Sequence, residues 1–556
     1  MRILALIGLC SSVLLGLPAL AGAQEGESDR STNLLSRSFS GGFPNGPSRN
    51  AAVSHDQRTA RLIAYESDAS DIVAGDSNAG TDVFVVRREG DTAGHGTPWR
   101  RGQTELVSSG IGGAPANGPS FAAALDGDSK HEPHCVAFVS AASNLVRGDT
   151  NGKPDAFVKD LRTGRLTRVS VDARGRQSRG NTTEVAIDGA CERVAFVSDS
   201  GDLALGRTAT PGWETARTTK PRGGLRQVYV RVLGGQRLDR GFAGLTFLAS
   251  ASRFGKAANG ASYGATFAPA GKAVAFVSEA TNLAPGDRSR ASDVYQRSFE
   301  RRFVHLGSGR GAQALDFDTR LVSASPGGRA GNGPSRSPSV TDSGRFVAFE
   351  TDATDLLSGD ANGVTDIARA DLKPRRVAQR WVSRSAATGI GNGPSSRPAI
   401  SGAGEFVLFD SDATNLRPRP DALVDQNGQR DVFLWNAPTG NVSLESRDSA
   451  NGLLPSASQA PATSSRGNYV PFESAYPLID IPLASMVAPE LVSNPSLLAP
   501  GLIPSLTVPG TLPVGLPPVP GVSARVARSS AGPKARAAAE PIPALQQVYL
   551  RYLGPK

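Results

Sequence analysis

The apolar positions of this chain recur in short runs separated by Gly, Pro, Asn and Asp. One run ends in an aromatic residue, often as Val-Ala-Phe, and its seven copies are residues 63–65, 136–138, 194–196, 274–276, 347–349, 407–409 and 470–472. A second run of β-branched and aromatic residues follows each copy, at 82–85, 155–158, 227–230, 293–295, 366–368, 431–434 and 547–550. Runs of this length and composition, without a helical period, predict short strands joined by turns.

Two further strands complete each repeat, as at 337–340 and 380–383 around the central copy. Four antiparallel strands are typical of a propeller blade, so the pattern predicts an all-β, seven-bladed β-propeller. The chain opens at 33–37 like a fourth strand and finishes at 547–552 like a third. We therefore expect the N-terminal strand to pair into the C-terminal blade and close the ring. Pro471, in a strand that should donate ladder bonds, leaves the blade count open by one.

The repeat carries a recognisable motif. It reads Pro-Ser-Val-Thr-Asp-Ser-Gly-Arg-Phe-Val-Ala-Phe-Glu-Thr at 338–351, and the next strand opens with an Asp, most clearly in Asp-Val-Phe-Val at 82–85. This pattern resembles the TolB-like, WD-related β-propeller repeat of bacterial envelope proteins, over 33–553 apart from insertions. TolB has an α/β domain before its propeller, which is missing here, so the resemblance implies the fold but not the role of TolB itself. Similar peptidases add a hydrolase domain, and similar oligogalacturonate lyases use a His-rich metal site, whereas this chain has five His.

The N-terminus predicts export. Residues 1–23 have Arg2, an apolar run and the small-residue end Ala21-Gly22-Ala23, which indicates a cleaved signal peptide. Residues 24–556 are then expected to form one propeller domain, periplasmic or secreted. No later apolar run is long enough for a transmembrane segment.

Cleavage leaves two cysteines, Cys135 and Cys191, just before aromatic runs of neighbouring repeats. Export and an even count favour a disulfide between them, although two separate buried thiols remain the alternative. The net charge of +9 comes from scattered residues without a dense basic run, so we expect no nucleic-acid partner.

Two loops recur. The connection between repeats carries Asn-Gly-Pro-Ser or Asn-Gly-Ala-Ser, interpreted as a structural turn, at 45–48, 117–120, 259–262, 332–335 and 392–395. The loop between the second and third strands reads D-x-N-x-x-x-D, and its oxygen-bearing residues are Asp76, Asn78, Asp82, Asp149, Asn151, Asp155, Asp360, Asn362, Asp366, Asp425, Asn427 and Asp431. Oxygen ligands at this spacing suit calcium. The alternative is that these side chains cap the backbone of their own loop, as Asx turns do.

Drift between repeats favours loop capping. The fourth repeat has Arg288 and Arg290 between its two Asp, and the third and seventh close the loop with Gln227 and Gln547. Both recurring loops should emerge on one face of the propeller, together with a Pro-rich insertion at 482–541. That insertion is interpreted either as an unstructured loop or as an apolar arm that binds a partner.

Catalytic motifs are missing from the sequence. The one His cluster, His131-Glu132-Pro133-His134, contains a Pro that prevents the helical zinc geometry. We therefore predict an exported, monomeric, non-enzymatic binding or scaffold protein that uses the face with the D-x-N-x-x-x-D loops, with an envelope protein or a polysaccharide as partner. The alternative is a polysaccharide lyase or hydrolase that uses carboxylates at the central channel.

Overall fold

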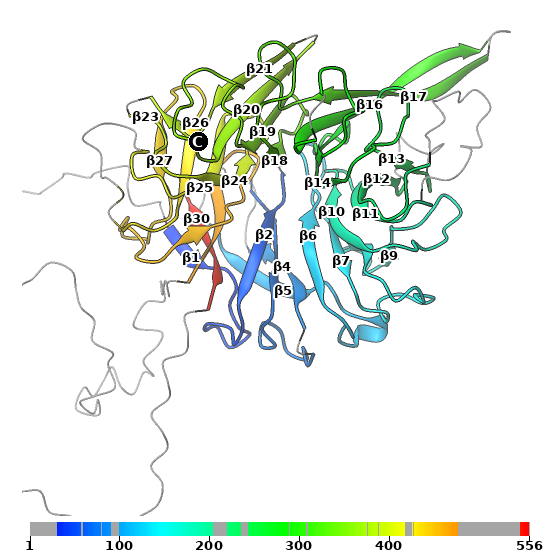
Figure 1. Ribbon diagram of the computed structural model, residues 1–556. Coiled ribbons are helices and arrows are strands. Elements are labelled where there is room, and N and C mark those ends of the chain that lie inside the picture. Colours follow the sequence, from blue (N-terminus) through cyan, green and yellow to red (C-terminus); the bar gives the residue numbers. More distant parts are fainter. Residues whose placement is uncertain are drawn as a thin grey trace, which may run out of the picture.

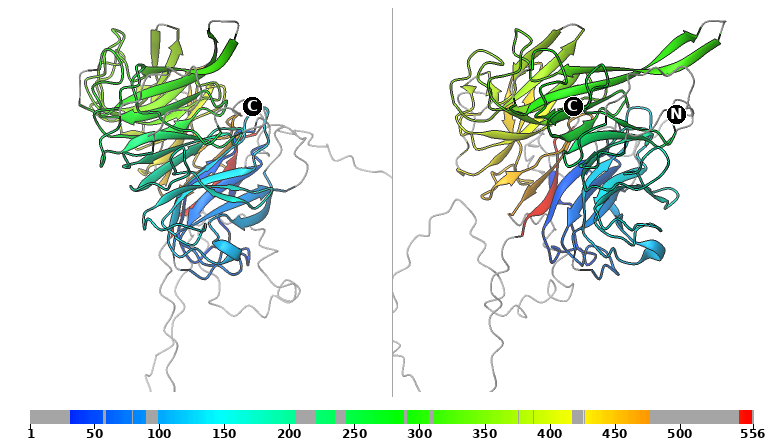
Figure 2. Two further views of the ribbon diagram at one scale, coloured as in Figure 1. Left: turned by 90° about the vertical axis from the view of Figure 1, so that its right-hand side faces the viewer. Right: turned by 45° about the vertical axis from the view of Figure 1, so that its right-hand side comes forward.

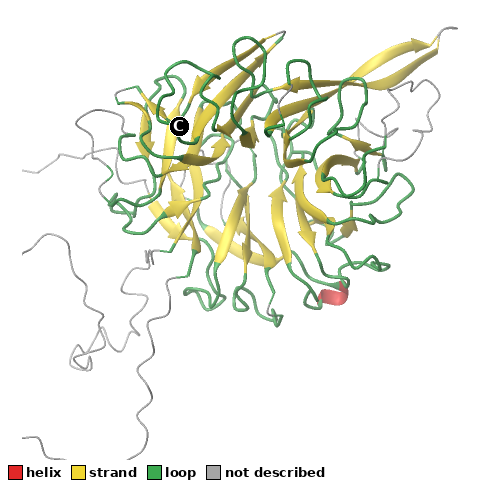
Figure 3. Cartoon of the chain, viewed as in Figure 1, coloured by secondary structure: helices red, strands yellow, loops and turns green. Residues whose placement is uncertain are grey.

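The computed structural model describes residues 31–554, except 57–58, 79, 90–98, 204–219, 235–242, 288–289, 307–309, 375, 387, 417–424, 426 and 476–544. The predicted signal peptide and the Pro-rich insertion at 482–541 thus lie outside the described residues. The described chain consists of strands and loops, with one short 3₁₀ turn, η1 (Ile111–Gly113) (Figure 3). Within the described residues no helix has the length and apolar character needed to cross a membrane.

Seven four-stranded antiparallel sheets form the predicted propeller, and we number these blades in chain order (Figure 1). Blade 1 contains β2 (Ser48–Val53), β3 (Leu62–Ser67), β4 (Asp82–Arg88) and β5 (Arg101–Leu106). Blade 2 contains β6 (Ser120–Leu125), β7 (Cys135–Ser140), β8 (Asp155–Asp160) and β9 (Leu166–Arg168). Blade 3 contains β10 (Thr182–Ile187), β11 (Arg193–Ser198), β12 (Gln227–Val232) and β13 (Thr246–Leu248). Blade 4 contains β14 (Ser262–Phe267), β15 (Ala273–Ser278), β16 (Asp293–Leu306) and β17 (Arg310–Leu321).

The remaining blades follow the same order of strands. Blade 5 contains β18 (Ser335–Val340), β19 (Phe346–Thr351), β20 (Asp366–Lys373) and β21 (Arg376–Trp381). Blade 6 contains β24 (Ser395–Ile400), β25 (Phe406–Ser411), β26 (Asp431–Asn436) and β27 (Val442–Leu444), after a small hairpin of β22 (Arg384–Ser385) and β23 (Gly389–Ile390). Blade 7 contains β28 (Ser458–Gln459), β29 (Tyr469–Ser474), β30 (Gln547–Tyr552) and β1 (Ser31–Leu34). The hairpin of β16 and β17 extends beyond the ring (Figure 2).

The ring closes as the sequence predicts, because β1 pairs with β30 in blade 7. The register runs from Ser31 opposite Tyr552 to Leu34 opposite Tyr549. Pro471 does not remove a blade. It lies in β29 opposite Leu550 of β30, and its carbonyl accepts a bond from Ala462 on the other side. A proline has no N–H to donate on that same side, where β28 has already ended. The loss of this donor therefore shortens only the innermost strand.

The hydrophobic core is divided into seven clusters, one between each pair of neighbouring blades. Between blades 1 and 2, for example, Leu62 and Val85 pack against Val136 and Phe138. Blades 7 and 1 share such a cluster too, which contains Tyr469, Val548 and Ile63. Since every blade buries both of its faces against neighbours, no repeat has a complete core on its own.

Candidate functional site

The two recurring loops lie side by side at one end of the ring, which we call the loop face. In blade 5 the Asn332 side chain donates to Thr354 Oγ1 (2.9 Å), and the Asn332 N–H donates to Asp355 Oδ1 (2.8 Å). Blades 1, 2, 4 and 6 repeat this pair of bonds. The Asn-Gly turns thus act as the structural connections that the sequence predicts. We call the opposite end, which carries the turns between the first and second strands, the turn face.

The D-x-N-x-x-x-D loops are held by their own side chains. In blade 5, Asp366 accepts bonds from Ser383 Oγ (2.6 Å) and from Asn362 Nδ2 (2.8 Å), and Asn362 also donates to the Gly391 carbonyl. Blades 2 and 6 have the same arrangement, which comprises Asn151 with Asp155 and Asn427 with Asp431. These contacts match the loop-capping interpretation of the motif.

The last position of the D-x-N-x-x-x-D motif keeps its structural role in the blades where Gln replaces the Asp. Gln227 in blade 3 accepts a bond from Ser250 Oγ, and Gln547 in blade 7 accepts one from Ser36 Oγ. The Asp at this position are deeply buried, and burial raises the pKa of Asp366 and Asp431 to about 6 and that of Asp293 to about 7. Each carboxylate is therefore costly to ionise without a partner.

A second set of carboxylates lies at the loop-face end of the second strands, buried against the next blade. The residue after the aromatic position of the second strand is acidic in four consecutive blades, 5, 6, 7 and 1, where it is Glu350, Asp410, Glu473 and Glu66. The same position is Val139, Val197 and Val277 in blades 2, 3 and 4. We call the four acids the acidic arc. All four are buried, with at most 4% of each residue exposed.

Each acid of the arc accepts a backbone N–H from the next blade, from its innermost strand or, in blade 7, from the residue just after that strand. The acceptors and donors, with N···O distances, are Glu66 and Ala122 (2.7 Å), Glu350 and Arg397 (2.8 Å), Asp410 and Ala460 (2.9 Å), and Glu473 and Asn50 (2.6 Å). All four donors have positive φ, and those in blades 1, 2 and 6 lie at register shifts of the innermost strand. The acidic arc thus satisfies N–H groups that these irregular strands leave outside their ladders.

Arginines at the mouth pair with the same acids. Arg336 bridges Glu350 (2.8 Å) and Asp352 (2.9 Å), and its side chain is 38% exposed. Asp410 forms ion pairs with both Arg397 (2.7 Å) and Arg430 (2.8 Å). In blade 1, Arg49 contacts Glu66 and Asp68. The mouth is consequently polar over blades 5, 6 and 1, with charges that are paired rather than free.

Sequence analysis missed the acidic arc, although its signal was present. Aligning the seven repeats on their aromatic residue places Glu, Glu, Asp and Glu in one column with three Val. Acids in a column that is otherwise apolar need buried partners. The backbone donors, however, depend on the register shifts of neighbouring strands, which the residue pattern does not reveal.

Below the mouth, the channel is apolar and small. A cavity of about 250 Å³ lies on the axis, and most of its lining residues come from the innermost strands and are Ala, Val, Leu or Ile. Its turn-face end is narrowed by backbone bonds between successive blades, among them Gly127 to Gly189, Asp342 to Gly402 and Gly402 to Ser465. This chamber has little in common with the carboxylate-lined channel that the enzymatic alternative requires.

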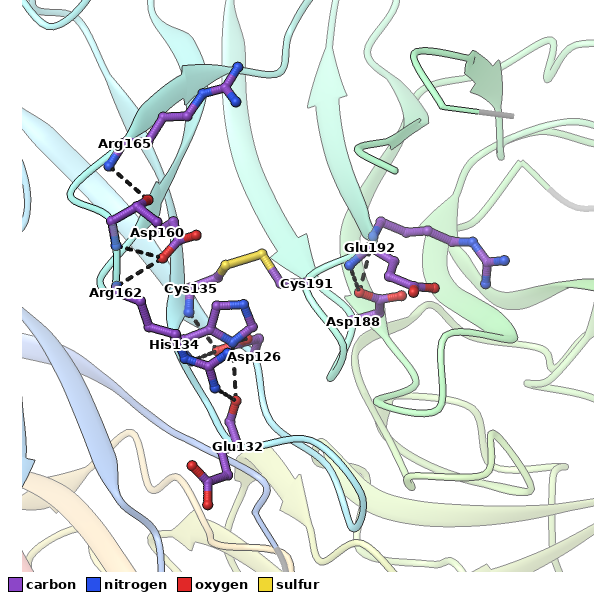
Figure 4. Close-up of a disulfide and its surroundings, with 12 residues drawn as sticks. Asp126, Glu132, His134, Cys135, Asp160, Arg162, Arg165, Asp188, Cys191 and Glu192 are labelled. Carbon is purple, nitrogen blue, oxygen red and sulfur yellow. Dashed lines mark hydrogen bonds and ion pairs between the residues drawn. A yellow bond between two sulfur atoms is a disulfide. The ribbon is translucent and has the colours of Figure 1, made fainter. Parts of the chain in front are cut away.

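The predicted cysteine pair forms a disulfide in the structure, with 6.1 Å between the Cα atoms (Figure 4). It joins β7 of blade 2 to the turn before β11 of blade 3. Asp126 and His134 lie beside it, and their ligand atoms and the two sulfurs lie within 4.8 Å of one another. His134 Nδ1 pairs with Asp126 (3.1 Å), whereas His131 Nδ1 pairs with Asp128 (3.0 Å). The two His of the cluster therefore face different carboxylates.

Large apolar side chains are exposed on the connections between blades. The four that the described residues contain are Phe39 (66% exposed), Phe43 (37%), Ile111 (50%) and Phe254 (76%). All four lie between the last strand of one blade and the first strand of the next. Ile111 also borders a pocket of about 490 Å³ between blades 1 and 2, with Glu105, Arg147 and Lys159 in its wall. The rim of the loop face is therefore partly apolar.

Comparisons with known proteins find only remote similarity. No family model and no curated protein matches the chain. Among solved structures, the putative TolB from Agrobacterium tumefaciens is 13% identical, with a TM-score of 0.30, over 62% of this chain and 83% of that one. The Pseudomonas aeruginosa periplasmic gluconolactonase is 12% identical, with a TM-score of 0.29, over 71% and 84% of the two chains. The Pyrococcus horikoshii acylaminoacyl peptidase is 9% identical, with a TM-score of 0.37, over 77% of this chain and 49% of the peptidase, about half its length. The chain is a seven-bladed β-propeller of four-stranded antiparallel blades.

Proposed function

We propose that this chain is an exported, non-enzymatic binding protein that holds an envelope protein or a polysaccharide at its loop face. The observation that carries the proposal is the placement of Phe39, Phe43, Ile111 and Phe254, all on connections between blades. Exposed aromatic and aliphatic side chains gathered on one face are typical of interaction surfaces. The disulfide and the signal-peptide pattern support an oxidising, extracytoplasmic compartment.

The carboxylates of the channel mouth argue for binding over catalysis. General acid–base chemistry needs a carboxyl group that is free to exchange a proton with substrate. The acids of the acidic arc accept backbone N–H bonds, and those of blades 1, 5 and 6 also pair with arginines. Their geometry serves the contact between blades.

Blocking one face at a time tests the proposal. Ala74 lies in a loop-face loop and Ala403 in a turn of the turn face, and both are exposed. Ala74→Cys and Ala403→Cys, each coupled to a polyethylene glycol maleimide, form a matched pair. We expect the label at position 74 to abolish crosslinking to a partner from the organism's envelope extract, and the label at position 403 to leave it unchanged.

Two results would overturn the proposal. Loss of crosslinking with the label at 403 alone would move the binding surface to the turn face. Turnover of an acidic or neutral polysaccharide, measured as new reducing ends or unsaturated uronates and lost in Glu66→Gln, would establish the enzymatic alternative.

A further inference from the structure

The D-x-N-x-x-x-D loop of blade 1 differs from its equivalents in its unpaired oxygens. Asp76 is 8% exposed and Asp82 is fully buried. Asp82 Oδ1 accepts a bond from Ser108 Oγ (2.6 Å), but Asp82 Oδ2 and Asp76 Oδ1 are buried without a hydrogen-bond partner. Asn78 donates to the Ala116 carbonyl, as its equivalents in blades 2, 5 and 6 donate to theirs, but it lacks their second bond to the closing Asp. Two carboxylates thus have unsatisfied buried oxygens in one loop.

Blade 2 contains a cation at the corresponding place. Arg168 Nη1 lies 3.2 Å from Asp149 Oδ1 and 3.5 Å from Asp155 Oδ2, so one guanidinium lies between the two carboxylates of the loop. In the sheet register Arg168 stands opposite Phe157. Leu106 stands opposite Phe84 at the same register position of blade 1. The two blades can therefore be compared directly, because at this register position blade 2 has the positively charged Arg168 and blade 1 has the apolar Leu106.

Burying two neighbouring carboxylates without a hydrogen-bond or charge partner costs free energy. Removing an ionised carboxylate from water without a partner costs several kcal/mol. A divalent cation would balance both charges, and a donor set made only of oxygens suits Ca²⁺.

We propose that Asp76 and Asp82 of blade 1 bind one Ca²⁺ at the position that the Arg168 guanidinium fills in blade 2. Water and main-chain carbonyls complete the six to eight oxygens that Ca²⁺ takes. The proposal narrows the calcium interpretation of the repeated motif to one of its four full copies. It is independent of what the loop face binds.

Blades 5 and 6 fit a cation less well. Their closing Asp use both oxygens, since Asp366 and Asp431 each bond one Ser and one Asn. Only the first Asp of each loop has an unpartnered oxygen, on Asp360 and Asp425. Of the four full copies of the motif, blade 1 is thus the one in which both carboxylates have a buried oxygen without a hydrogen-bond partner.

The test is calorimetric titration of the EDTA-treated mature protein with CaCl₂, beside its thermal unfolding in Ca²⁺ and in EDTA. We expect one site, with a Kd between about 10⁻⁵ and 10⁻³ M, and a Tm that rises with Ca²⁺. Asp76→Asn should weaken binding at least tenfold, because it removes one of the two charges. Asp149→Asn in blade 2 is the matched control and should leave binding unchanged.

Exchanging the residues at this register position between blades 1 and 2 makes the test more specific. Leu106→Arg should place a guanidinium between Asp76 and Asp82 and abolish the Ca²⁺-dependent rise in Tm. Arg168→Leu should expose Asp149 and Asp155 and add a second Ca²⁺ site. If Leu106→Arg fails to fold, the nearly isosteric Asp76→Asn still decides. No heat of binding up to 5 mM CaCl₂, or equal binding by wild type and Asp76→Asn, would overturn the proposal.

Discussion

His55 Nδ1 in blade 1 lies 3.1 Å from Asp342 Oδ1 in blade 5, so a hydrogen-bonded side-chain pair joins two blades that are not neighbours in the ring. The contact crosses the channel at its turn-face end, where backbone bonds already link successive blades. Both side chains are about one-fifth exposed, at 22% and 23%. The pair therefore adds a direct link across the ring, beside the bond that Ser465 of blade 7 donates to the same Asp342.

Substitution of His55 should reduce stability slightly, and substitution of Asp342 should reduce it more. We expect His55→Ala to lower the free energy of unfolding by roughly 0.5–1 kcal/mol, as partly exposed ion pairs do. Asp342→Ala should cost roughly 1–2 kcal/mol, because Asp342 Oδ2 also accepts a bond from Ser465 Oγ. Urea unfolding of both variants and of the double variant measures their coupling. A coupling of zero would mean that the contact does not stabilise the ring.

The acidic arc should stabilise the contact between blades through its backbone bonds. Glu66→Val introduces the residue that blades 2, 3 and 4 have at this position, but it leaves the Ala122 N–H without its acceptor. We expect a loss of roughly 1–3 kcal/mol, and a smaller loss for Glu66→Gln, whose Oε1 still accepts that bond. Glu279→Val, at an exposed site of blade 4, should change stability by no more than about 0.5 kcal/mol. Equal losses for Glu66→Val and Glu66→Gln would argue that the charge, not the backbone bond, matters.

The residue pattern predicted the blades well because each depends on local signals. The runs around Phe138 and Phe349, the Asn-Gly turns and the terminal strands all lie where their periodicity indicates. The link from Cys135 to Cys191 followed from the cysteine count and the predicted export. The channel mouth could not be predicted in this way, since Glu66 and Ala122 meet only through the register shift in β6. Contacts between blades depend on such small irregularities, which sequence periodicity averages out.

The positive-φ residue of the innermost strand offers a test of backbone strain. Ala122 has φ of 55° at the register shift in β6, whereas blade 4 has Gly264 with φ of 61° at its own shift. Because glycine adopts this conformation without steric cost, Ala122→Gly should stabilise the protein by roughly 0.5–1 kcal/mol. Ala124→Gly, two residues along the same strand, should destabilise it by a similar amount. Thermal unfolding of the two variants should therefore shift Tm in opposite directions, and shifts of the same sign would contradict the assignment of strain to position 122.

The pH dependence of stability should include a contribution from Asp188, which lies in the turn between β10 and β11. Its Oδ1 accepts bonds from the N–H groups of Glu192 and Arg193, and burial raises its pKa from 3.8 to about 7 against the favourable charge of Arg193. Between pH 4 and 7 the folded chain therefore holds a proton that the unfolded chain has released. The stabilisation from this proton is complete below about pH 4 and is lost as pH rises through 7.

Asp188→Asn keeps an oxygen acceptor but cannot ionise, so its stability should fall less than that of wild type between pH 5 and 8, by roughly 2–3 kcal/mol. Guanidinium unfolding at pH 5, 6, 7 and 8 measures the difference, and parallel curves for the two proteins would show that Asp188 is ionised in the native state throughout.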